Sequence, residues 1–186
     1  PEPLNTDHDL SEFDCGKSAL NEWLRNYALV NQAKGFTRVM VIQENSCLIG
    51  FYGLAPTAVP PSTLSRKVRS GRPPDPVPCI QFGQLAVDAT YAGKGVGSAL
   101  LRHALERCVA AAETIGGRAV IVRAIDRQAE EFWKACGFMP SRSDSSTLFR
   151  SIDNIAAWLA KTASAKSVLP DGCDGLPGAV LRDNPG

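Results

Sequence analysis

The sequence predicts a single mixed α/β domain, in which a mostly antiparallel sheet contains a β-α-β unit and is flanked by helices. Its length of 186 residues fits one domain, for which about 100–200 residues is usual. Its apolar content of 44% is that of a globular protein. Helix-like and strand-like patterns alternate from residue 18 onward. We therefore expect a folded domain over residues 1–160 and a loosely ordered tail over residues 161–186, which are rich in Gly, Pro and Ser.

The first part of the chain predicts a helix followed by a β-hairpin. Residues 1–16 are polar and are expected to form a lead-in. Apolar side chains recur at helical spacing over residues 18–31, which predicts an amphipathic helix. Residues 37–43 and 47–55 are β-branched and apolar on either side of a polar turn, which predicts the hairpin. Residues 56–78 are rich in proline, and we expect them to interrupt strand pairing wherever a proline falls.

The middle of the chain predicts the β-α-β unit. Residues 79–87 have strand character, and Gly83 within them indicates a bulge or a close backbone approach. A glycine-rich turn then leads into an amphipathic helix that starts at Ser98 and is stopped by Gly116. Residues 119–124 predict a buried strand.

The last part predicts two helices and a strand pair. Asp126 is suited to cap a short helix that Gly137 ends. Residues 138–139 and 147–150 predict the strand pair. Ser151 is expected to cap a last helix that extends to residue 160.

Charge and cysteine content exclude several classes of function. The 20 basic and 19 acidic side chains nearly cancel, so contact with nucleic acid requires a local patch. The six cysteines contain no C-x-x-C pair and the chain has only two histidines, so we expect reduced thiols and no metal site. Neither a signal peptide nor an apolar run of about 18 residues is present, so we expect a soluble cytoplasmic protein without membrane contact.

The glycine-rich turn is the most informative segment. Gly93, Gly95 and Gly97 permit positive φ and leave room for consecutive N–H groups to face one concavity. The start of the following helix adds unpaired donors and a positive dipole end, which together suit a pyrophosphate. The spacing is neither that of a Walker A loop nor that of a G-x-G-x-x-G dinucleotide fingerprint. By itself the turn also fits a plain strand-to-helix connection.

Three segments together resemble the GNAT superfamily of N-acetyltransferases: CIQFGQLAVD, TYAGKGVGSALL and AEEFWKACGF. The resemblance implies acetyl-CoA as cofactor, with pantetheine paired to the main chain of the strand, phosphates on the turn and Asp126 near the pantetheine. Ala92 departs from the Gln or Arg that the superfamily has at the start of this turn. The implied cofactor-binding residues are Leu85, Ala86, Val87, Gly93, Lys94, Gly95, Val96, Gly97, Ser98 and Asp126.

A narrower resemblance is to the acetyltransferase toxins of bacterial toxin–antitoxin pairs, the TacT and AtaT group. It rests on FDCGKSALNEWL, RKVRSGRPPDPVP, GQLAVD and FWKACGFMPS. It implies an aminoacyl-tRNA as acceptor, a homodimer and a small DNA-binding antitoxin as partner. A basic loop near the site is then expected to hold the tRNA by its phosphates, although four such charges also fit a solvated loop. The basic residues are Arg66, Lys67, Arg69 and Arg72.

The resemblance also identifies a departure at the expected proton donor. These toxins have Phe-Tyr where this chain has Phe132-Trp133, and an indole N–H donates a hydrogen bond without giving up its proton. Our hypothesis is that Trp133 lines the thioester pocket, and the alternative is that it packs in the core with Ala129 and Cys136. Tyr52 is a second candidate acid, whereas His103 is expected to be exposed.

The sequence leaves three functions open. The first is acetylation of the amino acid on tRNA, which would block translation. The second keeps the fold and acetylates a small amine or a protein N-terminus. The third is a coenzyme A-binding module without catalysis, which Ala92 and Trp133 favour.

Overall fold

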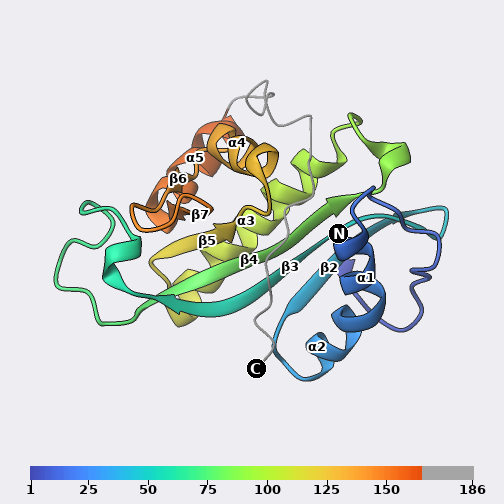
Figure 1. The fold of residues 1–186 in the computed structure, drawn as a ribbon, viewed down its shortest axis with the longest axis horizontal. Coiled ribbons are helices and arrows are strands. Elements are labelled where there is room, and N and C mark those ends of the chain that lie inside the picture. The colour runs from blue at the N-terminus through green and yellow to red at the C-terminus, as the bar shows by residue number, and fades with distance from the viewer. Residues whose placement is uncertain (165–186) are drawn as a thin grey trace.

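The computed structural model describes residues 1–164, which form a seven-stranded sheet with helices on both faces (Figure 1). The strand order is β1-β2-β3-β4-β5-β7-β6, and all neighbours are antiparallel except β4 and β5. The parallel pair is joined through α3, so the predicted mixed sheet with a β-α-β unit is confirmed. The strands are β1 (Glu2–Pro3), β2 (Arg38–Glu44), β3 (Cys47–Val59), β4 (Val77–Val87), β5 (Ala119–Arg123), β6 (Met139–Pro140) and β7 (Thr147–Ser151).

The helices lie close to where the sequence predicts them. The first predicted helix is α1 (Ser18–Trp23) and α2 (Leu29–Ala33), joined without a break by a π-helical turn, η1 (Leu24–Ala28). The others are α3 (Val96–Ile115), α4 (Arg127–Ala135) and α5 (Ile152–Ser164), with 3-10 turns η2 (Pro61–Thr63) and η3 (Ala89–Tyr91). Because α5 continues to Ser164, the predicted domain boundary at residue 160 falls inside a helix. The rest of the predicted tail, residues 165–186, lies outside the described residues.

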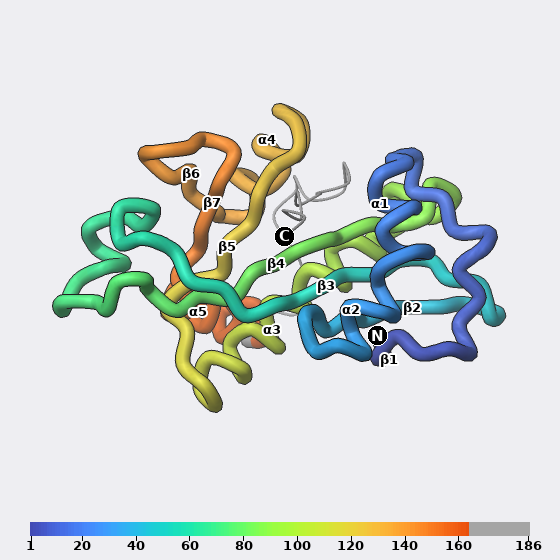
Figure 2. Tube along the Cα trace, turned by 60° about the horizontal axis from the view of Figure 1, so that its bottom comes forward, coloured from blue at the N-terminus to red at the C-terminus, as the bar shows by residue number. Residues whose placement is uncertain are grey.

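Each face of the sheet has its own packed layer (Figure 2). On one face, Leu101 and Leu105 of α3 pack with Phe82 of β4. On the other face, Leu20 and Leu24 pack with Phe51 of β3. Burying side chains of this size stabilises a fold by roughly 1.5–3 kcal/mol each, so the sheet is held from both sides.

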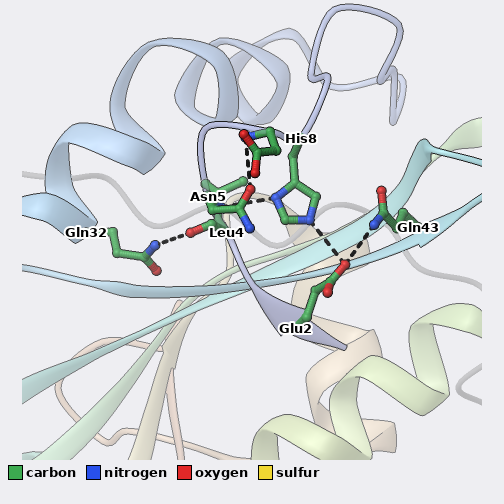
Figure 3. Close-up of polar contacts among 7 residues, drawn as sticks. Glu2, Leu4, Asn5, His8, Gln32 and Gln43 are labelled. Carbon is green, nitrogen blue, oxygen red and sulfur yellow. Dashed lines mark hydrogen bonds and ion pairs between the residues drawn. The ribbon is translucent and has the colours of Figure 1, made fainter.

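The polar lead-in contains a strand that the sequence did not predict. β1 pairs with β2, and its connection to α1 buries Leu4 and Phe13. Figure 3 shows the polar contacts that hold this segment: Glu2 accepts from Gln43 Nε2 at 2.8 Å and contacts His8 Nε2 at 3.2 Å, while the Leu4 carbonyl accepts from Gln32. A strand of two residues is too short to show an alternation of apolar and polar side chains. The sequence therefore cannot predict β1, which is held by contacts with residues distant in the chain.

The expectation that every proline interrupts pairing is wrong at two positions. Pro56 and Pro78 lie within β3 and β4, where they pair with Ile80 and Ala58. β2 pairs with β3 only as far as Leu54, so a proline beyond that point loses no ladder hydrogen bond on that side. Pro78 contributes its carbonyl, which accepts from the Arg118 N–H at 2.8 Å.

β4 contains the predicted bulge, and beyond its pairing with β5 the two strands separate, which we call the divergence of β4 and β5. Tyr52 pairs with Leu85 and Leu54 with Phe82, so Gly83 and Gln84 together oppose the single residue Gly53. β5 pairs with β4 only at Ile80 and Gln81, although β4 continues to Val87. The main chain of residues 82–87 therefore has no partner in β5, which leaves donors and acceptors on that side for another extended group.

Two further findings concern residues 1–164. None of their helices combines the length and the apolar character needed to cross a bilayer. Nowhere in this part of the chain do three His, Cys, Asp or Glu side chains gather closely enough to hold a metal ion.

Candidate functional site

The turn between β4 and α3 has the geometry of an anion site. Gly93 and Gly95 adopt φ of 73° and 78°, and Gly95 is the N-cap of α3. A Cβ at either glycine would meet no atom within 4 Å, so the loop is open at both positions. The first-turn N–H groups of α3 lack intrahelical partners, and the buried Ser98 Oγ has no hydrogen-bond partner within the described residues. An anion with several acceptor oxygens, such as a pyrophosphate, fits these donors.

Side chains around the turn brace it. Lys94 Nζ lies 4.7 Å from the centre of the Tyr91 ring, and Tyr91 Oη donates to Glu44 at 2.7 Å. Lys94 is therefore held beside the glycines by a cation–π contact. Its charge adds to the attraction that the start of α3 exerts on an anion.

Asp88, directly after β4, ties this turn to the segment before α1. Its carboxylate accepts from Thr90 N and Oγ1 at 2.9 and 2.6 Å and from the Asp14 N–H at 3.1 Å. Asp14 in turn accepts from Asn21 and Gly16, and its carbonyl accepts from Ala89. Burial alone would raise the pKa of Asp88, but these hydrogen bonds hold it below its usual value. Asp88 thus fixes both the start of the turn and its distance from α1.

We expect Asp88→Ala to weaken acetyl-CoA binding by about tenfold while leaving the sheet intact, because the turn loses three hydrogen bonds to a carboxylate. Calorimetric titration with acetyl-CoA measures the effect. Asp88→Asn, which keeps one acceptor oxygen, should lie between the wild type and the alanine variant. Equal affinities for all three proteins would contradict the role given to Asp88.

Trp133 lies in the core beneath the divergence of β4 and β5. Its side chain is fully buried and makes edge-to-face contacts with Phe82, Phe132 and Phe138 at centroid distances of 5.3, 5.1 and 5.1 Å. Cys136 belongs to the same cluster. The indole Nε1 is buried without a hydrogen-bond partner in residues 1–164. The aromatic contacts explain why the ring is buried. They do not explain the buried N–H group, because such donors normally bond to protein, water or a ligand.

Tyr52 is directed toward α3. Its hydroxyl lies 2.7 Å from Nδ1 of His103, and its ring contacts Phe82 at a centroid distance of 5.8 Å. Burial raises the pKa of Tyr52 well above its usual value. Burial, together with the positive charges of Pro1 and Arg107, lowers the pKa of His103. His103 is partly buried rather than exposed as predicted, because α3 packs directly over β3 at this point.

The lowered pKa of His103 predicts a pH dependence of stability. The unfolded chain, with a histidine pKa near 6.5, binds the proton more readily than the folded one. The contribution of neutral His103 to the free energy of unfolding is therefore fully present above that pH and is lost as the pH falls below it. We expect urea unfolding midpoints at pH 7.5 and 5.5 to differ less in His103→Gln than in the wild type. An unchanged difference would contradict this assignment.

Asp126 has two structural partners. Its Oδ1 accepts from the Ala129 N–H at 2.7 Å and so caps α4, and its Oδ2 lies 3.3 Å from Lys17 Nζ. The N–H of Ala129 and the charge of Lys17 lower the pKa of Asp126, against the effect of burial. Lys17 directly precedes α1, whereas Asp126 follows β5. This ion pair therefore connects the segment before α1 with the β5 side of the gap between β4 and β5. Asp126 also lines a pocket of about 480 Å³ beside α4.

The basic residues of the loop between β3 and β4 are all exposed. Within residues 1–164 none of Arg66, Lys67, Arg69 and Arg72 forms a hydrogen bond or an ion pair through its side chain. Leu64 and Val68 anchor the loop by packing against Ile121. Arg118 Nε donates to the Val68 carbonyl at 2.6 Å. The four charges are thus presented to solvent from an anchored segment.

Comparison with known proteins identifies the family. Residues 5–138 match the acetyltransferase (GNAT) family. The chain belongs to the GNAT acetyltransferases. It is 38% identical over 144 residues to a tRNA-acetylating toxin of Mycobacterium tuberculosis, an alignment that covers 77% of this chain and 86% of that protein.

Solved structures of toxins resemble this GNAT domain. AtaT complexed with acetyl-methionyl-tRNAfMet is 27% identical with a TM-score of 0.77, over 84% of this chain and 96% of that one. AtaTR bound with acetyl-CoA is 27% identical with a TM-score of 0.74, over 84% and 95%. A tyrosine-to-phenylalanine variant of KacT is 25% identical with a TM-score of 0.75, over 82% and 92%. The resemblance to the GNAT superfamily and its toxin group is confirmed.

The GNAT fold separates the predicted site residues into three groups. Those of β4 and the following turn are contiguous and lie beside α3. Trp133 and Tyr52 both contact Phe82 of β4 and so belong with this group. Asp126 forms an ion pair with Lys17, which precedes α1, and the basic loop lies beyond the opposite end of β4. The sequence does not predict roles for Asp88, Lys17 and His103, because each has a partner that is distant in sequence: Asp14, Asp126 and Tyr52 respectively. The signal that could have indicated Asp88 is its position at the end of the LAVD segment.

Proposed function

We propose that this GNAT acetyltransferase transfers the acetyl group of acetyl-CoA to the α-amino group of an aminoacyl-tRNA and thereby blocks translation. The observation that carries the proposal is the anion-binding turn at the start of α3, beside a strand whose main chain has no partner in β5 over residues 82–87. The acceptor is inferred from the relatives, which include a tRNA-acetylating toxin and a structure with acetyl-methionyl-tRNAfMet.

The residues present fit acetyl-CoA. In the proposed complex, the main chain of Leu85, Ala86 and Val87 pairs with the pantetheine as an added strand would. The pyrophosphate is bound by the segment from Gly93 to Ser98, where the Ser98 hydroxyl gains the partner it lacks. Bound acetyl-CoA supplies an activated acyl group and a thiol leaving group. We assign Asp126 a positioning role, because its carboxylate is already occupied by Ala129 and Lys17.

Trp133 is the proposed contact for the reacting thioester. Its Nε1–H lies buried without a partner and suits an acceptor atom that arrives with the cofactor. An indole does not release this proton, so water or another hydroxyl must protonate the departing thiolate. Tyr52 remains the second candidate acid, but its hydroxyl is held by His103. Trp133 therefore stabilises charge rather than transferring a proton.

The basic loop is the proposed tRNA-binding surface. Arg66, Lys67, Arg69 and Arg72 are exposed and free of ion pairs within the described residues, as phosphate contacts require. Such contacts are sequence-independent and weaken steeply with salt. Each charge removed from this loop should reduce the salt dependence of tRNA binding by about one phosphate contact.

The proposal includes a small DNA-binding antitoxin as partner, a homodimeric assembly and a cytoplasmic location. AtaT has been seen bound to the C-terminus of the antitoxin AtaR, which supports the first. The homodimer follows from the resemblance to the toxin group. Light scattering of the purified chain measures its mass in solution, and a monomer at micromolar concentration would contradict the dimer.

The deciding experiment incubates the protein with labelled acetyl-CoA and total aminoacyl-tRNA, and identifies the acetylated amino acid. Label on aminoacyl-tRNA is expected. Label only on small amines or protein N-termini would replace the acceptor while retaining the enzyme. Acetyl-CoA binding without any label would favour the coenzyme A-binding module, for which Trp133 in place of the relatives' tyrosine is the supporting observation.

A further inference from the structure

A polar pocket lies on the face of the sheet opposite α3, where β4 and β5 make their last pair. It has a volume of about 250 Å³. Its floor is formed by Thr57 of β3, Gln81 of β4 and Arg123 of β5, and its walls come from the start of the basic loop and from Ser141 and Ser143 after β6. Gln81 pairs with Ile121, the last pair before the strands diverge. The pocket thus adjoins the proposed reaction site from the side away from α3.

Three side chains that line the pocket have hydrogen-bond donors that no described residue uses. Neither Arg123, Gln81 nor Thr57 forms a side-chain hydrogen bond with any residue of the described chain. The acidic residue of the pocket is already satisfied, because Asp144 accepts from Ser146 N and Oγ and from Thr147 Oγ1 at 3.0, 2.7 and 2.7 Å. These bonds, and to a smaller extent the positive charge of Arg123, lower the pKa of Asp144. Arg123 therefore lies within electrostatic reach of Asp144 but makes no hydrogen bond to it, and its guanidinium N–H groups, with the amide of Gln81 and the hydroxyl of Thr57, can donate to a phosphate and to sugar hydroxyls.

The pocket is continuous with the basic loop. Ile121 lies in the floor of the pocket and also packs against Leu64 and Val68, which anchor that loop. A nucleic acid strand held by the loop therefore reaches the pocket without crossing the sheet. The volume is below the range of about 300–1,000 Å³ usual for small-molecule sites, so the pocket takes one small polar group rather than a duplex.

We infer that this pocket binds the terminal ribose and its 5′ phosphate at the 3′ end of the acceptor RNA, with Arg123 on the phosphate and Thr57 and Gln81 on the ribose hydroxyls. The inference rests on the proposed function. In this arrangement, the ester of the terminal ribose carries the amino acid from the pocket toward the divergence of β4 and β5. The pocket then positions the acceptor, while the basic loop supplies affinity.

The test measures equilibrium binding of the RNA trinucleotide CCA to the full chain and to three variants. Arg123→Ala and Thr57→Val remove the proposed contacts, and both are expected to weaken binding, the first by at least about tenfold. Arg107→Ala is the matched control, because Arg107 is an exposed arginine on α3 at the opposite face. It should bind the trinucleotide as the wild type does. Thermal unfolding of each variant checks that the fold is retained.

The outcomes separate the pocket from the proposed function. Undetectable trinucleotide binding by the wild type, or equal binding by Arg123→Ala and the wild type, overturns the pocket even if aminoacyl-tRNA is acetylated. Arg123-dependent binding without acetylation of aminoacyl-tRNA overturns the function and leaves the pocket as an RNA-end site. If both hold, Arg123→Ala should raise the KM for aminoacyl-tRNA and leave the affinity for acetyl-CoA unchanged.

Discussion

Gly95→Ala is expected to weaken acetyl-CoA binding by about a hundredfold or more. The added methyl group would occupy open space on the turn proposed to bind the phosphates, where at present no atom lies within 4 Å. It would obstruct at least two N–H bonds to phosphate, and hydrogen bonds to charged groups contribute roughly 1.5–3 kcal/mol each. Calorimetric titration with acetyl-CoA measures the loss.

The chain offers a close control for backbone strain. Gly35, at the end of α2, has φ of 77° against 78° for Gly95, and a Cβ there would also meet nothing within 4 Å. Both alanine variants therefore incur the same left-handed strain, about 1–2 kcal/mol, but only one lies at the proposed phosphate site. Equal acetyl-CoA affinity for the two variants would refute the assignment of the turn.

Trp133→Tyr is expected to raise kcat, and Trp133→Phe to lower it. A tyrosine would restore a proton donor, and a positioned general acid contributes about 10²–10⁴ in rate. The gain should lie near the lower limit, because a thiol with a pKa near 8.5 is already a fair leaving group. Phenylalanine removes the unpartnered Nε1–H and should lower kcat by about tenfold. Single-turnover kinetics with aminoacyl-tRNA at saturating acetyl-CoA measure both effects.

Stability must be measured alongside, since both substitutions leave a void among Phe82, Phe132 and Phe138. Losses of about 1–3 kcal/mol in the free energy of unfolding are expected from such a void. These losses should be similar for the two variants, so their difference in kcat isolates the polar group. No gain with tyrosine and no loss with phenylalanine would assign Trp133 to the core alone.

Local sequence signals predicted the elements that depend on neighbouring residues. Asp126 caps α4 as its residue type suggests, Gly137 ends that helix with φ of 82°, and Ser151 Oγ accepts from Asn154 at the start of α5. The turn after β4 was predicted for the same reason, because its glycines are adjacent in the chain.

Contacts between distant residues could not be predicted from spacing. Asp14 and Asp88 are 74 positions apart, and Tyr52 and His103 are 51 positions apart. The pocket around Arg123 draws its floor from three strands whose order is set by the folded sheet. Pro56 was misjudged because its tolerance depends on where β2 ends.

The bulge in β4 reverses which side chains face which helix. Before it, Ile80 and Phe82 point to α3, and after it Leu85 and Val87 do, while Ala86 joins the cluster around α1. Strict alternation over the eleven residues of β4 would not allow this change of parity. If both residues stayed in the chain and the bulge were lost, regular alternation would turn Leu85 and Val87 away from α3 and direct Ala86 toward it. Deleting one residue at position 83 or 84 would instead remove the bulge and keep Leu85 and Val87 on the α3 side. Gene variants that lack one of these two codons should therefore keep the same residues of this strand buried on each face of the sheet.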